Sequence, residues 1–449
     1  MVTVSQALER VKSDVAKLLT PDAIRQACHE NGHRWRKRLL DPVTTLQLFI
    51  QQVVHGNTAC THLRHLTGEP VTAAAYCQAR KRLPLGVLQA IVQRVARLLD
   101  QTADEQERFC GHRTWLVDGS GFSMPDTPVL QAHFGQPGAQ KPGCGFPVAH
   151  LLALFSAQTG VLHEFSAAPL RTHDMSQVQR VHPALRAGDV LVADRGFCSF
   201  AHLALILRGS LHAVLRMHQK QIVDLAPGRP HTVQTGKRRK SGLPTSRWVR
   251  RLGRDDQIVE WVKPPQAPGW MTAAEYDALP DTLRVRELRY HIGVPGVRTR
   301  AVTLVTTLLD PEQYPASKLA KLYAARWTIE LNLRHLKTTM GLDVLKCKTV
   351  SGVLKELHVF VLVYNLIRTV MLKAARCQRV ALARISFIDA QRWLCSAKPG
   401  EDLRPLVVNP LRPNRVEPRC IKRRPKEYEV MKWPRKKLRQ RLLGKRDTS

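Results

Sequence analysis

Apolar residues recur at three- and four-residue intervals through the first 105 residues, in runs that end at Gly or Pro. This spacing places them on one face of an α-helix, so we predict a helical N-terminal domain over residues 1–105. The segment "TPDAIRQACHE" opens with Thr20, a typical helix N-cap, and carries an acid in its first turn. Basic side chains such as Arg80, Lys81 and Arg82 gather on these helices. A DNA-binding bundle and an ordinary bundle with solvated charges both fit, because no helix-turn-helix motif stands out.

Runs typical of β-strands replace the helical spacing from residue 113 onward. The segment "RTWLVDGSGFSM" predicts a strand that ends at Asp118 and Gly119, and "DVLVADRGFCS" predicts a buried strand that ends at Asp194. The same stretch predicts two strands joined by a turn at 158–160, a strand at 211–217, and helices near 174–186 and 200–208. Strands and helices in this order predict an α/β fold with a mixed sheet.

Residues 218–312 interrupt this pattern with alternating segments that are rich in Arg and Pro. We expect a β-rich insertion with a basic face there. Helical spacing resumes at Ser317 and continues through "GVLKELHVFVLVYNLIRTVMLKAARC". The α/β core is thereby divided into a first part over 106–217 and a second part over 313–380, followed by a basic C-terminal region over 381–449. In its last part, 411–449, 15 Lys or Arg stand against 4 Asp or Glu, which favours a tail over a packed core.

Composition indicates the kind of partner. The 449 residues include 70 Lys and Arg against 36 Asp and Glu, a formal net charge of +34. A charge of this size favours a polyanionic partner such as nucleic acid. Since 44% of the residues are hydrophobic, the chain can bury the core of an enzyme-sized protein, unlike a short basic packing protein.

Neither a membrane partner nor a structural zinc site is expected. The most apolar stretch, "VFVLVYNLI" at 359–367, is too short to span a bilayer, and the N-terminal residues do not have the pattern of a signal peptide. The ten cysteines include no Cys-x-x-Cys pair. Reduced thiols in the cytoplasm are therefore the expected state.

The segment "YAARWTIELNLRHLKTTMGLD", residues 323–343, predicts one long helix with polar groups along the edge of its buried face. At about 100° per residue, Tyr323, Arg326, Glu330 and Lys337 fall within roughly 60° of one another, and Arg334 points the same way. The adjacent flank carries an apolar stripe: Leu322, Ile329, Leu333, Leu336 and Met340. Two interpretations stay open. Arg326 and Glu330 can form an ordinary i,i+4 ion pair worth a few tenths of a kcal/mol, or the polar side chains can line a cleft that follows DNA phosphates.

Two earlier aspartates favour the second interpretation. Asp118 and Asp194 each follow a predicted strand and precede a Gly within two residues. A turn-forming role would explain either of them alone. Together with Glu330, however, they make three carboxylates, which can hold two Mg²⁺ ions about 3.5–4 Å apart, as in metal-dependent phosphoryl transfer.

These residues carry a resemblance to a known family. The spacing Tyr-x2-Arg-x3-Glu-x6-Lys is met in full within 323–343, and Asp118-Gly119 and "DRGF" at 194–197 supply two further acids in matching contexts. In these motifs the sequence resembles the DDE transposases of bacterial insertion sequences, over about residues 110–380. A β-rich insertion between the second and third acids agrees with that family.

The resemblance implies a ribonuclease H-like catalytic core, with Asp118 on its first strand, Asp194 on its fourth and Glu330 on a helix beside the sheet. These three acids would be both the catalytic residues and the metal ligands, for two Mg²⁺ ions that Mn²⁺ can replace. The residues expected to bind DNA are Tyr323, Arg326, Arg334 and Lys337.

In related enzymes an aromatic residue of the insertion stacks on a flipped base. The candidates in this sequence are Trp248, Trp261, Trp270 and Tyr290. A buried strand position is the alternative for each of them.

The resemblance further implies cut-and-paste DNA transposition, in which a strand is cleaved at each end of the element and the freed 3′-OH attacks target DNA. The expected partners are the terminal inverted repeats and the target, both double-stranded DNA, bound by at least a dimer at the nucleoid of a bacterial cytoplasm. The alternatives are a metal-dependent nuclease without strand transfer and a non-catalytic DNA-binding protein or repressor derived from a transposase.

Overall fold

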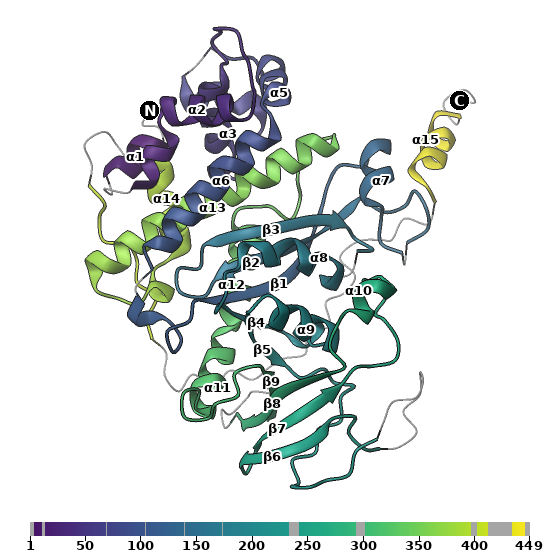
Figure 1. The fold of residues 1–449 in the computed structure, drawn as a ribbon. Coiled ribbons are helices and arrows are strands. Elements are labelled where there is room, and N and C mark those ends of the chain that lie inside the picture. The colour runs from purple at the N-terminus through teal and green to yellow at the C-terminus, as the bar shows by residue number, and fades with distance from the viewer. Residues whose placement is uncertain are drawn as a thin grey trace.

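A nine-stranded mixed sheet with helices on both faces forms the centre of the computed structural model of this chain (Figure 1). The structure describes residues 4–444 except 11–13, 69, 104, 139, 173, 233–241, 293–300, 397–401 and 412–432. The strands lie across the sheet in the order β3-β2-β1-β4-β5-β9-β8-β7-β6. The mixed α/β class predicted from the sequence is confirmed.

Five strands form the half of the sheet that contains Asp118. They are β1 Thr114–Ser123, β2 Val148–Ser156, β3 Leu162–Pro169, β4 Val190–Ala193 and β5 His212–Arg216. β2 pairs antiparallel with both β1 and β3, whereas β4 pairs in parallel with both β1 and β5. β4 is apolar and buried throughout, as expected for a parallel strand that is covered on both faces. Because β1, β4 and β5 run in parallel, their carboxyl ends point to the same edge.

The strands of the predicted insertion continue this sheet. β9 Ala301–Thr306 pairs antiparallel with β5, and it is followed across the sheet by β8 Thr282–His291, β7 Asp256–Val262 and β6 Arg247–Gly253. The last strand, β6, exposes Arg247, Arg250 and Arg251. Charged side chains on an edge strand discourage further strand pairing. Residues 233–241 and 293–300 of the insertion lie outside the described part of the chain.

Side chains of β1 alternate between two hydrophobic cores. Trp115 and Val117 pack with α8 Asp174–Val181 and α9 Phe200–Arg208, whereas Leu116 and Phe122 pack in the core that contains α13 Val350–Gln378. Asp118 is two residues beyond Leu116, so its side chain lies on the α13 face of the sheet. A short helix, α10 Ala273–Asp277, adds Tyr276 to the core on the α8 face.

The N-terminal helices lie at one end of the molecule, where α3 and α6 pack against α13 (Figure 1). They are α1 Val4–Arg10, α2 Pro21–Glu30, α3 Pro42–Val54, α4 Leu63–Thr67, α5 Ala73–Arg82 and α6 Leu85–Gln101. Thr20 caps α2 as predicted, since its side chain accepts a hydrogen bond from the backbone N–H of Ala23. Buried side chains of these helices and of α13 belong to one continuous hydrophobic cluster.

The apolar stretch at 359–367 is part of α13, which is 29 residues long. By length and composition this helix could cross a membrane, contrary to the judgement from the stretch alone, but 78% of its most apolar window is buried inside the protein. Buried polar bonds also fix it in place. Arg368 donates from Nη2 to the backbone oxygen of Thr159 at 2.6 Å, and Asn365 exchanges two hydrogen bonds with the backbone of Leu162. α13 therefore has the surroundings of a core helix.

In the C-terminal region the described residues form the α-helices α14 Phe387–Ser396 and α15 Arg435–Gly444. α14 belongs to the core around α13, through Phe387 and Leu394. Most of α15 is exposed, and its first residue, Arg435, forms an ion pair with Asp126 at 2.6 Å. Residues 412–432 and 445–449 of the predicted tail lie outside the described part of the chain.

Candidate active site

Two acidic residues lie next to each other where the parallel strands diverge. β1 and β4 pair up to Val117 and Ala193, so Asp118 and Asp194 occupy the next position on each strand. Asp194 directly follows β4, as predicted. The prediction that the first strand ends at Asp118 is wrong. β2 pairs with β1 along its whole length to Ser123 and keeps it extended past the end of β4.

The sequence suggested that Gly119 forms a turn, but in the structure it lies within β1. Its lack of a side chain leaves room for His150 of β2 and Asp174 of α8, whose side chains contact each other on the α8 face of the sheet. A Cβ atom on Gly119 would collide with His150 Nε2 and Asp174 Oδ1. The Asp-Gly pair thus combines a carboxylate on one face with space for a His–Asp contact on the other.

The helix that carries Glu330 is not continuous. α11 Ala316–Ala325 and α12 Trp327–Arg334 meet at Arg326, and a π-helical turn over His335–Thr339 follows. The backbone N–H of Arg326 bonds three residues back to Tyr323, and that of Ile329 bonds three residues back to Arg326. The prediction of one regular helix is therefore wrong. The tight turn at Arg326 and the wide π-helical turn after Arg334 change the angle between successive side chains. Lys337 therefore does not lie at the angle predicted from a regular α-helix.

Burial along this segment separates the polar residues that the sequence grouped. The apolar stripe is buried as predicted at Ile329, Leu333, Leu336 and Met340, and Leu322 is half-buried. Tyr323 and Arg326 are also buried, whereas the Glu330 side chain is 47% exposed. Within the Arg326–Glu330 pair, Glu330 therefore presents its charge to solvent, whereas Arg326 does not.

Arg326 lies between two of the acids. Its Nη1 is 3.9 Å from Asp118 Oδ2, and its Nη2 is 3.4 Å from Glu330 Oε1. The guanidinium also lies over the rings of Tyr323 and Trp327, with its carbon 5.6 Å and 5.3 Å from their centroids. The i,i+4 pair expected from the sequence is thus present, but its cation is buried and shared with a carboxylate from the sheet.

Tyr323 connects the same helix to the remaining acid. Its hydroxyl donates to Asp194 Oδ1 at 3.4 Å. Burial raises the pKa of Tyr323 to about 12 and the Asp194 charge adds to the shift, against the opposing effect of Arg326. The phenol therefore keeps its proton and stays a donor at neutral pH.

Electrostatic effects join the three acids into one cluster. Burial raises the pKa of Asp118, with smaller contributions from the Asp194 and Asp174 charges, while the Gly119 N–H and Arg326 oppose the rise. Burial acts to lower the pKa of Arg326, but its electrostatic interactions with Tyr323, Asp194, Asp118 and Glu330 outweigh this effect and raise that pKa. A single guanidinium thus responds to all three carboxylates.

The structure does not bring Arg334 and Lys337 into contact with these acids. No hydrogen bond or ion pair within the described ranges joins either side chain to Asp118, Asp194 or Glu330. Arg334 is exposed at the end of α12, and Lys337 is half-buried in the π-helical turn. Their contact with DNA remains a prediction.

The aromatic candidates of the insertion differ in their surroundings. Trp261 is buried in β7 and donates from Nε1 to Glu287 at 3.0 Å, which fits the buried-strand alternative. Trp248 and Trp270 are half-buried. Burial raises the pKa of Tyr290 of β8, and the charges of Arg216 and Arg326 oppose this rise, so Tyr290 is electrostatically linked to Arg326 of the site.

Two residues near the site were missed by the sequence analysis. Arg216 is the last residue of β5, at the same edge as Asp194, and its charge acts on Tyr323. Its place at the end of a parallel strand was a usable signal. Trp327 is 54% exposed beside the Arg326 guanidinium, and it offers a flat apolar surface next to Glu330. The position of Trp327 inside the helix segment did not indicate that its ring would be exposed.

The donor set suits a divalent cation. Carboxylate oxygens are ligands that Mg²⁺ and Mn²⁺ prefer. Among the residues that the structure describes, however, no three His, Cys, Asp or Glu side chains converge closely enough to hold an ion. Arg326 stands between Asp118 and Glu330 and supplies the positive charge there. Glu330, with a half-exposed side chain on α12, is the donor that can move with least disturbance of the core.

Comparison with known proteins identifies the family of this chain. A family model described as "Transposase DDE domain" matches residues 110–366, more than half of the chain. The chain is also 24% identical over 378 residues to the Escherichia coli (strain K12) protein "Transposase InsG for insertion sequence element IS4", covering 80% of this chain and 78% of that relative.

Among solved structures, the cryo-EM structure of the piggyBac transposase synaptic complex with hairpin DNA aligns over 88% of this chain and 80% of its own, with a TM-score of 0.44 and 9% identity. This likeness is too distant to assign any residue. The family model is the finding that decides the matter: the chain belongs to the transposase DDE domain family, and it is a transposase that acts on DNA and depends on a divalent metal ion.

Proposed function

We propose that Asp118, Asp194 and Glu330 are the catalytic carboxylates of this transposase. The observation that carries the proposal is their common partner, because Arg326 contacts Asp118 and Glu330 and is affected by the charge of Asp194. The three acids come from β1, from the residue after β4 and from α12. A fold that collects distant carboxylates around one buried cation is suited to bind metal ions and phosphates at the same place.

The strand order supports a ribonuclease H-like core. The first three strands are antiparallel, and β4 and β5 extend β1 in parallel. Asp118 then lies on the first strand of the core and Asp194 follows the fourth. β6 to β9 would be the insertion between the second and third acids, with the predicted domain limits of 218–312.

The bound ions are proposed to be two Mg²⁺ per site, replaceable by Mn²⁺, held by Asp118, Asp194 and Glu330. Such ions supply the activation of an attacking oxygen and neutralise charge on the phosphate. The chain's own groups position the ligands. The Gly119 N–H donates to Asp118 at 2.8 Å, and the Tyr323 hydroxyl donates to Asp194.

Arg326 has two roles in this proposal. Without ions it compensates the charge of Asp118 and Glu330, which would otherwise repel each other in a half-buried site. With DNA bound, its planar guanidinium can donate two hydrogen bonds to one phosphate beside the cleaved bond. Arg334, Lys337 and the exposed Trp327 extend this surface along the helix segment.

The proposed reaction is cut-and-paste transposition. Water breaks a P–O bond at each end of the insertion sequence and leaves a 3′-OH. That 3′-OH then attacks a phosphodiester of target DNA, so one P–O bond forms as another breaks. The substrates would be the terminal inverted repeats and target DNA in the nucleoid. Since two ends must be held together, we expect a dimer in the complex with DNA.

Cleavage and joining assays with the purified chain test this function. The substrate is linear DNA that carries the inverted repeats flanking the gene, incubated with Mg²⁺. We expect Asp118→Asn, Asp194→Asn and Glu330→Gln to lower cleavage by at least about 10²-fold, because each removes several kcal/mol of metal-dependent stabilisation. DNA affinity should stay within about threefold, since the basic surface is intact.

Asp281→Asn is the control, because it removes a carboxylate whose side chain is 96% exposed at the start of β8. A variant of one of the three acids that cleaves like the wild type would exclude that residue from the site. Cleavage without joining would indicate a nuclease, and sequence-specific binding by an inactive wild type would indicate a repressor.

A further inference from the structure

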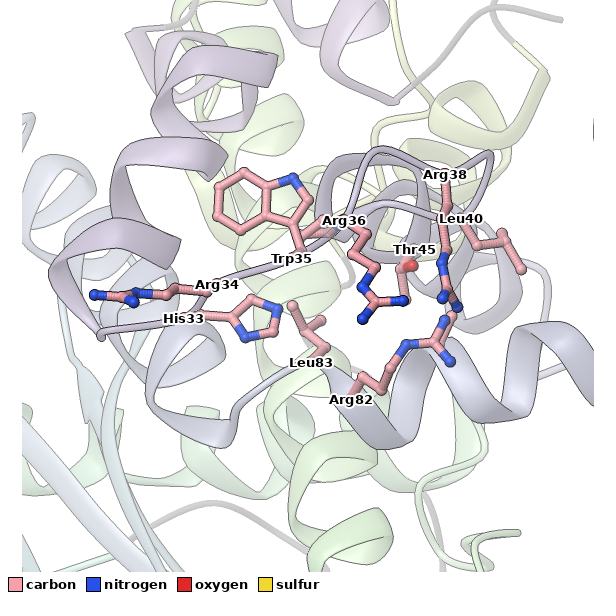
Figure 2. A pocket seen from close by; sticks show the side chains of 11 residues that line it. His33, Arg34, Trp35, Arg36, Arg38, Leu40, Thr45, Arg82 and Leu83 are labelled. Carbon is pink, nitrogen blue, oxygen red and sulfur yellow. The ribbon is translucent and has the colours of Figure 1, made fainter.

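A second basic site lies in the N-terminal helices, apart from the three acids. A pocket of about 220 Å³ opens between the connection from α2 to α3 and the end of α5. Arg36, Arg38 and Arg82 contribute charged side chains to it, and His33, Thr45 and Leu83 line the remaining wall. Figure 2 shows the guanidinium groups of Arg36, Arg38 and Arg82 gathered on one side, whereas Arg34 points away.

These three arginines have no ion-pair partner among the residues that the structure describes. Within the described ranges no ion pair or hydrogen bond joins Arg36, Arg38 or Arg82 to an acceptor. Asp41, the acid closest in sequence to Arg36 and Arg38, accepts a hydrogen bond from the Thr44 N–H at 2.8 Å as the N-cap of α3. Three cations held side by side repel one another, and an anion between them would remove that repulsion.

Stabilisation of helix ends does not explain the cluster. Arg82 lies in the last turn of α5, where a cation is favourable. Arg36 and Arg38, by contrast, precede α3, and Pro42 and Thr45 at the start of that helix line the same pocket. The N-terminus of a helix carries partial positive charge, which disfavours cations and favours anions. The position of Arg36 and Arg38 therefore indicates a ligand rather than a contribution to stability.

The loop that carries these arginines is held by aromatic packing. Trp35 lies against His29 and His33, with ring centroids 5.0 Å and 5.8 Å apart. Burial and the nearby Lys355 ammonium lower the pKa of His33, so the ring is neutral at physiological pH and the surrounding potential is positive. The Arg36 and Arg38 side chains are exposed, whereas Trp35 of the same loop packs against His29 of α2.

We propose that this pocket binds a phosphodiester group of duplex DNA, as a contact separate from the catalytic site. The inference rests on the proposed function, which supplies the DNA. The pocket is smaller than the about 300–1,000 Å³ typical of small-molecule sites, so it suits one phosphate of a strand better than a whole cofactor. The helices that carry the pocket, α2, α3 and α5, lie on the far side of α13 from the sheet (Figure 1). A phosphate contact there would hold DNA at a distance from the cleaved bond and would not depend on the DNA sequence.

Binding measurements on the full chain test the proposal. Arg36→Gln, Arg38→Gln and Arg82→Gln are compared with Lys37→Gln, which removes the same charge from the same loop but does not line the pocket. The probe is a fluorescent duplex of arbitrary sequence, titrated without divalent ions at several salt concentrations. Each pocket variant should weaken binding about tenfold and reduce the slope of log affinity against log salt by about one, as expected for a lost phosphate contact. Lys37→Gln should change affinity by less than about threefold.

Equal effects of the pocket variants and of Lys37→Gln would overturn the proposal, because only net charge would then matter. A second result would also overturn the proposal. If inorganic phosphate stabilised the wild type but not the pocket variants, and DNA binding were unchanged in those variants, the ligand would be a free anion. Thermal unfolding of each variant ensures that folded proteins are compared. Because this assay needs no cleavage, an inactive wild type would contradict the proposed function and leave the pocket result standing.

Discussion

At the scale of single residues, Arg326 separates the two interpretations of the helix segment 323–343. An exposed i,i+4 pair with Glu330 would contribute only a few tenths of a kcal/mol. The guanidinium is instead 5% exposed and lies 3.9 Å from Asp118 as well as 3.4 Å from Glu330. A buried cation in this position opposes the rise in the pKa of Asp118 that burial causes.

Replacing Arg326 should therefore change the pH dependence of the reaction. Burial already raises the pKa of Asp118, and the Arg326 charge opposes that rise. In Arg326→Gln the pKa of Asp118 should rise further. Since only the ionised carboxylate binds a cation, cleavage should fall most at low pH and recover as the pH increases. The acid limb of kcat/KM for cleavage should thus move to higher pH.

Arg334→Gln is the matched control, because it removes an exposed cation from the same helix segment. We expect its acid limb to stay in place. An unshifted limb in Arg326→Gln would mean that Arg326 does not control Asp118.

At the scale of elements, the two faces of β1 hold different groups at adjacent residues. Asp118 faces α12 and α13, and the next residue, Gly119, makes room for the His150–Asp174 contact on the α8 face. Gly119→Ala should destabilise the fold by about 1–3 kcal/mol, because a new methyl group would force that contact apart. Unfolding in urea measures the change in free energy.

Gly121→Ala tests the same strand and the same face. A Cβ there would meet its nearest neighbours at 3.7 Å, an ordinary contact. We expect little loss of stability or a small gain, since alanine restricts the unfolded chain. If both variants lost the same free energy, the explanation of Gly119 by the His150–Asp174 contact would be wrong.

Local patterns predicted most elements of the core, and long-range packing explains what they missed. The strands around 190 and 212 were found because short apolar runs between turns identify buried strands. The extension of β1 past Asp118 depends on pairing with β2, and the helix breaks at Arg326, whose guanidinium contacts Asp118 of the sheet. Neither has a signal in neighbouring residues.

In the candidate site, too, local motifs predicted some residues and long-range packing accounts for the others. Asp118, Asp194 and Glu330 were found from motifs. Arg216 reaches the site only through strand order, and Asp174 acts on Asp118 across the sheet.

At the scale of the whole molecule, a buried carboxylate joins the N-terminal helices to the core. Glu356 of α13 is fully buried and accepts hydrogen bonds from the Asn57 side chain at 2.6 Å and from the backbone N–H groups of Lys346 and Cys347. Asn57 belongs to the turn after α3, so this one side chain bridges segments about 300 residues apart in the sequence.

Glu356→Gln should lower the free energy of unfolding by about 1–3 kcal/mol, because an amide group cannot accept from all three donors. Glu312→Gln, at an exposed position, serves as the control and should change stability by less than about 0.5 kcal/mol. Thermal unfolding of both variants provides the comparison. Equal stabilities would show that the bridge contributes nothing to the attachment of the N-terminal helices.

The central claim is that Asp118, Asp194 and Glu330 form one metal centre, and counting bound Mn²⁺ in the complex with DNA tests it most directly. We expect about two ions per catalytic site in the wild type, as in other two-metal centres, and fewer in Asp118→Asn. Asp174→Asn removes a neighbouring carboxylate on the opposite face of the sheet, and it should keep the wild-type number. Wild-type occupancy and affinity in Asp118→Asn, or a loss of ions in Asp174→Asn alone, would contradict the account.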